Sequence, residues 1–83
     1  MTDILIVDDE RDIRELISEI LIDEGYQTRL SGGADDCLQE LKRSVPGLLI
    51  LDIWLKDSEM DGIDILVKAK REFPQVPVVI ISG

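Results

Sequence analysis

Acidic side chains follow two of the apolar runs in this sequence. Residues 4–7 (ILIV) lead directly into Asp8 and Asp9, and residues 48–51 (LLIL) lead into Asp52. A short apolar run of this kind is typical of a strand that is buried on both faces. If the two strands are parallel neighbours, about 4.8 Å apart, their carboxyl ends bring the three carboxylates into one small site. The sequence therefore predicts that Asp8, Asp9 and Asp52 act together.

Carboxylates gathered in this way favour a bound cation. Like charges at short range raise one another's pKa unless a cation neutralises them, and hard oxygen ligands at an exposed edge suit Mg²⁺. A carboxylate beside such an ion can attack phosphorus and become an aspartyl phosphate, while a hydroxyl such as that of Ser82 holds the transferred group. Acids that merely cap or solvate a helix N-terminus are the alternative, which we prefer for Glu10 but not for the clustered three.

A helix is expected after the first acidic pair. Its apolar residues recur at spacings of three and four, which is the pattern of an amphipathic helix whose apolar stripe faces the core. Gly25 supplies the end of this helix. The stripe consists of Ile13, Leu16, Ile17, Ile20 and Leu21.

The rest of the chain continues to alternate between strand and helix. Residues 26–30 alternate at period two, as in an edge strand, and residues 31–33 (SGG) form its turn. A helix over residues 34–43 places Cys37 inward as a structural thiol. A polar loop follows the strand at residues 48–51. Residues 63–73 then form a third helix, and residues 78–81 form the last strand.

This strict alternation predicts an α/β fold. It is a doubly wound, mostly parallel sheet with right-handed crossovers and helices on both faces. In open sheets of this kind, ligands bind beyond the carboxyl ends of the strands. Asp8, Asp9, Asp52 and Ser82 all lie at such ends.

Composition limits the chain to one small domain with few classes of partner. Its 83 residues carry 18 acids, 9 bases and no histidine, so the net charge is −9. That field repels phosphate backbones and anionic membranes, and we expect no nucleic-acid or membrane binding by this piece. A single cysteine, Cys37, excludes an internal disulfide, and we expect a cytoplasmic location.

The sequence resembles the receiver domain of two-component response regulators over its whole length. Several positions carry the resemblance together. They are residues 4–10 for the first strand with its acidic pair, Asp52 for the phosphoacceptor, Asp61-Gly62 for the turn before the third helix, Pro77 before the last strand, and Ser82 for the hydroxyl that closes it.

This resemblance implies a flavodoxin-like receiver fold that signals through phosphorylation. Asp52 would accept a phosphoryl group from a histidine kinase. The side chains of Asp9 and Asp52 and the backbone carbonyl of Trp54 would bind Mg²⁺, with Asp8 helping through water. Ser82 would contact the phosphoryl group as a switch hydroxyl. The module assists its own phosphoryl transfer but is not a turnover enzyme, and the complete protein would take part in transcription regulation.

Two departures from the family pattern refine this expectation. The loop that follows Asp52 is long and lacks the usual proline, which resembles the NtrX type of regulator. The family's fourth helix, fifth strand, fifth helix and phosphoryl-contacting lysine have no counterpart in residues 1–83. We therefore expect a C-terminally truncated N-terminal part of a single receiver domain, with impaired phosphorylation. The exposed edge of the fourth strand then favours a homo-oligomer or segment exchange.

Two other classes of protein share parts of this pattern. Aspartate-nucleophile phosphohydrolases also begin with a strand that ends in acids, but they require Asp-x-Asp spacing, whereas Asp8 and Asp9 are adjacent. An acidic α/β interaction domain without chemistry is the third possibility.

Overall fold

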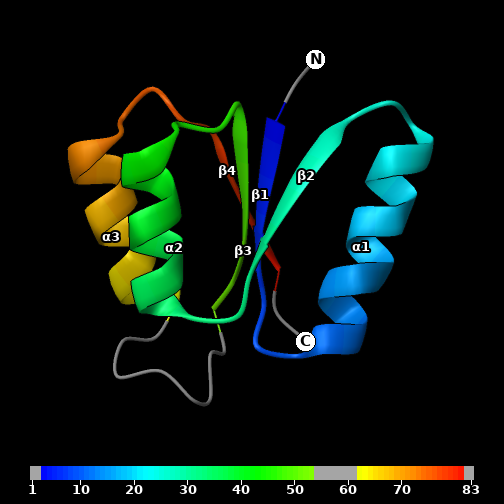
Figure 1. Ribbon diagram of the computed structural model, residues 1–83. Coiled ribbons are helices and arrows are strands. Elements are labelled where there is room, and N and C mark those ends of the chain that lie inside the picture. Colours follow the sequence, from blue (N-terminus) through cyan, green and yellow to red (C-terminus); the bar gives the residue numbers. More distant parts are fainter. Residues whose placement is uncertain (1–2, 54–61, 82–83) are drawn as a thin grey trace.

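Strands and helices alternate throughout residues 3–53 and 62–81, the parts of the chain that the structure describes. This computed structural model (Figure 1) contains one parallel sheet with the strand order β2-β1-β3-β4. The predicted α/β fold with a parallel sheet is thus confirmed. The elements are β1 (Asp3–Val7), α1 (Arg11–Asp23), β2 (Gln27–Ser31), α2 (Ala34–Arg43), β3 (Leu48–Asp52), α3 (Gly62–Glu72) and β4 (Val78–Ile81).

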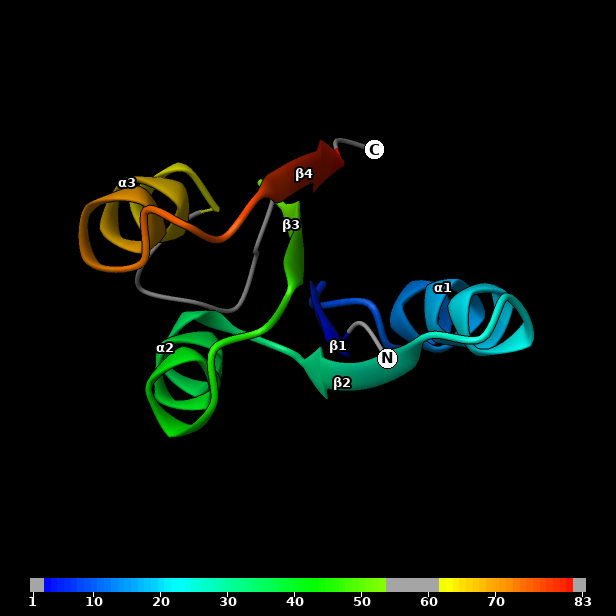
Figure 2. The same cartoon turned by 90° about the horizontal axis from the view of Figure 1, so that it is seen from above.

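The helices cover both faces of the sheet. Figures 1 and 2 show α1 on one face and α2 with α3 on the other. Because alternate residues of a strand point to opposite faces, a strand between two helical layers must be apolar throughout. Residues 4–7 of β1 are accordingly all buried. No helix among residues 3–53 and 62–81 is both long and apolar enough to cross a membrane.

The main core lies between the sheet and the α2–α3 layer. Cys37 belongs to it, and burial raises the pKa of this thiol to about 12, with the charge of Asp36 adding to the effect. A thiol with such a pKa stays protonated and unreactive near neutral pH, as expected of a structural cysteine. The core consists of Leu5, Val7, Ala34, Cys37, Leu41, Leu49, Leu51, Ile65, Ala69 and Val76.

The apolar stripe of α1 is only partly covered by the sheet. Leu16 and Ile20 are 53% and 56% exposed. The helix instead rests on the sheet through a narrower strip that includes the buried Ser18, whose Oγ lies 2.7 Å from Thr28 Oγ1 of β2. Among the described residues no second helix lies beside α1, so the outer part of the stripe remains in contact with solvent.

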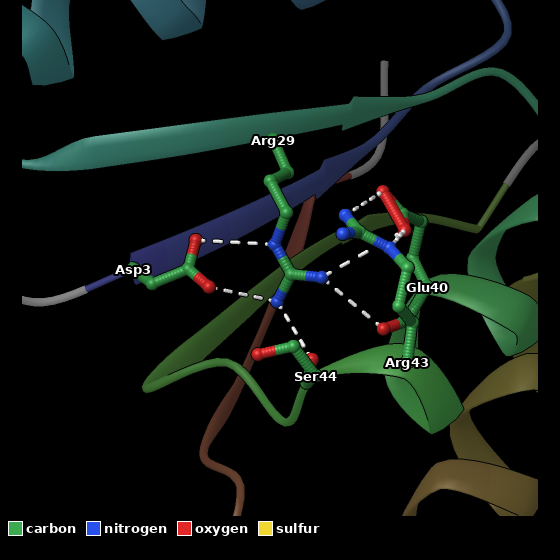
Figure 3. A network of polar contacts seen from close by, with 5 residues as sticks. All are labelled: Asp3, Arg29, Glu40, Arg43 and Ser44. Carbon is green, nitrogen blue, oxygen red and sulfur yellow. Dashed lines mark hydrogen bonds and ion pairs between the residues drawn. The ribbon is translucent and has the colours of Figure 1, made fainter.

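Arg29 joins three elements at the end of the sheet where β1 begins (Figure 3). Its Nη2 lies 2.8 Å from Asp3 Oδ2, and its Nε donates to Asp3 Oδ1 at 3.2 Å. Its Nη1 and Nη2 also donate to the backbone carbonyls of Glu40 and Ser44, at 3.1 and 2.8 Å. The last carbonyls of a helix lack partners within the helix, so Arg29 both caps the end of α2 and fastens it to β1.

Replacement of Arg29 by methionine is expected to lower the free energy of unfolding by about 2 kcal/mol, since it removes a charged partner from two carbonyls and from Asp3. Urea denaturation measures this change. Arg29→Lys is expected to restore only part of the stability, because an ammonium group lacks the planar fork of a guanidinium. The control is Arg11→Met, which removes an exposed pair with Glu15 and should leave stability unchanged. Equal effects of Arg29→Met and Arg11→Met would contradict the assigned role.

Candidate metal centre

Three carboxylates meet where β1 and β3 end. Asp8 and Asp9 directly follow β1, and Asp52 is the last residue of β3. The two strands run parallel with Val7 opposite Leu51, so they end at the same level. One carboxylate oxygen from each of Asp8, Asp9 and Asp52 lies within 4.8 Å of the others. This trio of hard oxygen ligands fits Mg²⁺, which prefers such ligands.

The surroundings of the three carboxylates differ. Asp8 is buried, with 3% of its surface exposed, whereas Asp9 and Asp52 are half-buried. Burial raises the pKa of Asp8. The backbone N–H of Glu10 opposes that rise, and the charges of Asp52, Asp9 and Glu10 add to it. The deprotonated Asp8 is therefore held at an energetic disadvantage that a cation in the cluster would relieve.

The main chain around Asp8 is held by residues that the sequence pattern did not single out. The Asp8 N–H donates to the carbonyl of Ser31 at 3.1 Å, and Asp8 Oδ1 accepts a hydrogen bond from the Glu10 N–H at 2.8 Å. Arg14 Nη1 donates to the Asp8 carbonyl at 2.8 Å. Ser31, predicted to lie in the turn, is instead the buried last residue of β2. Glu10 thus serves this site through its backbone.

The start of α3 packs closely against the main chain that follows Asp52. The Gly62 N–H donates to the Ile53 carbonyl at 3.1 Å. A Cβ at Gly62 would lie 2.5 Å from the Asp52 carbonyl oxygen, which is far inside van der Waals contact. Glycine is therefore required at this position for α3 to approach β3.

Other predicted site residues cannot be placed. Trp54, Asp61 and Ser82 lie outside the described residues. The strand that precedes Ser82 is described to its end, and Ile81 is paired with Asp52 in the register of β3 and β4. The structure thus brings together Asp8, Asp9 and Asp52 from the predicted set.

Comparisons with known proteins agree on one family. The sequence model of the response regulator receiver domain matches residues 4–83. The nitrogen assimilation regulatory protein NtrX of Azorhizobium caulinodans is 54% identical over 81 residues, which are 98% of this chain and 18% of that protein. A putative NtrX-like response regulator of Rickettsia bellii is 47% identical over 83 residues, 100% of this chain and 17% of that protein. This chain thus spans less than a fifth of either relative.

Solved structures of similar fold point the same way. The receiver domain of NtrX from Brucella abortus has a TM-score of 0.95 and 49% identity, covering 98% of this chain and 68% of that chain. The response regulator TrrA from Thermotoga maritima, solved in complex with Mg²⁺–BeF, has a TM-score of 0.92 and 28% identity, covering 99% of this chain and 70% of that chain.

Asp8→Asn is expected to stabilise the metal-free protein at pH 7 by about 1–2 kcal/mol, since it removes the cost of burying a charge and the repulsion by the other acids of the cluster. Because the pKa of Asp8 is raised in the folded state, its destabilising effect begins above its usual pKa and is complete above the raised value. The gain should therefore disappear when the pH falls below the usual carboxyl pKa. Urea denaturation in EDTA at several pH values measures it.

Mg²⁺ provides the complementary test of the same cluster. It should raise the stability of the parent protein more than that of Asp8→Asn, because a ligand stabilises the state that binds it. Asp12→Asn is the matched control, since it removes one charge from the exposed first turn of α1. An Asp8→Asn protein that is less stable than its parent in EDTA at pH 7 would contradict the electrostatic interpretation.

Proposed function

The chain belongs to the response regulator receiver domain family, and on that premise we propose that Asp52 is its phosphoacceptor. Receiver domains of this NtrX-type group are modules of two-component signal transduction and are generally not turnover enzymes. The observation that carries the proposal is the convergence of Asp8, Asp9 and Asp52, whose oxygens lie within 4.8 Å of one another. The partner that donates the phosphoryl group is a histidine kinase.

The transfer uses the half-buried carboxylate at the end of β3. A carboxylate oxygen of Asp52 attacks the phosphorus of a phosphohistidine, so that a P–O bond forms and the P–N bond breaks. The electron pair of the broken bond returns to the imidazole nitrogen of the kinase. The position of Asp52 at the carboxyl edge of the sheet leaves it accessible from outside, whereas Asp8 is buried too deeply to meet a partner protein.

The receiver family binds Mg²⁺, and the acidic cluster supports the same ion here. When bound, Mg²⁺ neutralises charge between the attacking carboxylate and the incoming phosphoryl group. In our proposal the side chains of Asp9 and Asp52 and the carbonyl of Trp54 hold the ion. Asp8 orients a water molecule toward it through its carboxylate, and the hydroxyl of Ser82 donates to the phosphoryl group. The roles of Trp54 and Ser82 rest on the sequence pattern alone.

The place of this chain in a larger protein is part of the proposal. Residues 1–83 are the N-terminal part of a single receiver domain, which is supported by the 68% of the Brucella abortus receiver chain that they cover. In our proposal the whole protein is a cytoplasmic transcription regulator. The names of its regulatory relatives support the role in regulation.

Acetyl phosphate tests the phosphoacceptor directly. In the full-length protein with Mg²⁺, the intact mass is expected to rise by one phosphoryl group, and Asp52→Asn or EDTA should abolish the gain. Asp12→Asn should leave the gain unchanged, because Asp12 lies outside the cluster. Labelling that persists in Asp52→Asn would contradict the proposal, and steady phosphate release from unrelated monoesters would instead support a phosphohydrolase.

We also propose that the isolated 83-residue chain associates with a second copy through β4. In the described sheet β4 is an edge strand, and its Val79 and Ile80 are 47% and 43% exposed. An apolar edge strand of this kind readily pairs with another strand.

Light scattering is expected to give a dimer or larger species for the isolated chain. Val79→Lys should shift it toward the monomer, because a charge on an edge strand opposes pairing. Val45→Lys is the matched control, since Val45 is equally exposed but lies between α2 and β3. A monomeric parent chain at high concentration would contradict this association.

A further inference from the structure

Arg14 lies in the first turn of α1, the helix that follows β1 and the acidic pair Asp8-Asp9. We propose that Arg14 is a positioning residue of the metal centre, which fixes the main chain at Asp8 and thereby sets the Mg²⁺ affinity of the cluster. This inference rests on the proposed function, because it assigns a device that serves the same site. The Nη1 of Arg14 donates to the Asp8 carbonyl at 2.8 Å, while its backbone N–H makes the first helical hydrogen bond of α1, to the Glu10 carbonyl at 3.0 Å.

The hydrogen bond from the Arg14 side chain to the Asp8 carbonyl can be removed by substitution. Two further hydrogen bonds at Asp8 come from main-chain groups, the carbonyl of Ser31 and the N–H of Glu10, which no side-chain substitution removes. Because only 3% of Asp8 is exposed, water has little access to replace a lost donor at this residue. Loss of the Arg14 guanidinium therefore favours a shift of the segment that carries Asp8 and Asp9.

Gly32 leaves room for the guanidinium of Arg14. Its substitution is therefore a second way to disturb the hydrogen bond between Arg14 and the Asp8 carbonyl. A Cβ at Gly32 would lie 2.9 Å from Arg14 Nη1 and 3.7 Å from Cζ. The atom in the way is the tip of a flexible side chain, so Gly32→Ala moves the guanidinium rather than the backbone. Gly32 does not have a positive φ, and alanine therefore fits its main chain. This variant displaces the hydrogen bond while the positive charge stays in the protein.

Loss of the Arg14 hydrogen bond should weaken Mg²⁺ binding without displacing the attacking carboxylate of Asp52. Arg14 holds the loop after β1, whereas Asp52 belongs to β3 and is positioned by the sheet and by the close approach of Gly62. Groups that orient metal ligands without touching the metal commonly change affinity by 10-fold or more. A displaced Asp8–Asp9 segment thus weakens Mg²⁺ binding but leaves the attacking carboxylate in place once the ion is bound.

The test uses Mg²⁺ titration calorimetry and phosphorylation by acetyl phosphate in the full-length protein. Arg14→Met is expected to raise the Mg²⁺ Kd about 10-fold and Gly32→Ala about 3-fold. Both variants should need more Mg²⁺ for half-maximal phosphorylation, yet reach the parent rate at saturating Mg²⁺. A residue that merely stabilises the fold would not raise the Mg²⁺ concentration needed for phosphorylation while leaving the rate at saturating Mg²⁺ unchanged. The matched control, Arg11→Met, lies on the same helix and should keep the parent Kd, because Arg11 is exposed and forms its ion pair with Glu15.

Each outcome has a definite meaning. A parent Kd in both Arg14→Met and Gly32→Ala overturns the role of Arg14 while leaving the proposed function intact. A parent protein that neither binds Mg²⁺ nor is phosphorylated on Asp52 overturns the proposed function and this inference with it. If Arg14→Met fails to fold, Gly32→Ala decides alone, and a maximal rate that falls at saturating Mg²⁺ also counts against positioning through the metal.

Discussion

Repulsion among three carboxylates at the end of two parallel strands is the constraint that organises this protein. The register of β1 and β3 places Val7 opposite Leu51, so the next residues of both strands deliver acids to the same place. Burial raises the pKa of Asp8, and the charges of Asp52 and Asp9, whose oxygens lie within 4.8 Å, add to that rise. A divalent cation held by the three carboxylates would relieve this repulsion.

The scaffold around the cluster resists this repulsion through apolar burial and main-chain hydrogen bonds. β1 is covered on both faces, which leaves its residues little freedom to move apart. The chain then passes directly into Asp8, whose N–H, carbonyl and carboxylate each have a hydrogen-bond partner. At β3, the absence of a side chain on Gly62 lets α3 pack against the backbone after Asp52. Asp8 is thus supported by hydrogen bonds to its main chain and from the main chain of Glu10.

Two arginines donate hydrogen bonds to main-chain carbonyls near opposite ends of β1. Arg14 donates to the carbonyl of Asp8 just beyond the carboxyl end, and Arg29 donates to the carbonyls of Glu40 and Ser44 while it pairs with Asp3 at the start. In a chain with a net charge of −9, these guanidinium groups join elements that are distant in sequence. Substitution of Arg29 tests the stability of the fold, whereas substitution of Arg14 tests the site, because only Arg14 contacts an acid of the cluster.

The sequence by itself determined the order of the elements, the parallel sheet and the delivery of Asp8, Asp9 and Asp52 to strand ends, because these follow from local periodicity and from the rules of parallel connections. The partners of Asp8 were decided only by the tertiary structure. Ser31, Arg14 and the Glu10 N–H carry no pattern of their own, since a hydrogen bond to the main chain depends on where segments meet rather than on residue spacing. The exposed fractions of Leu16 and Ile20 were likewise decided by the tertiary structure. Helical periodicity identifies the apolar face of α1, but the width of that face which becomes buried depends on which neighbours pack against it.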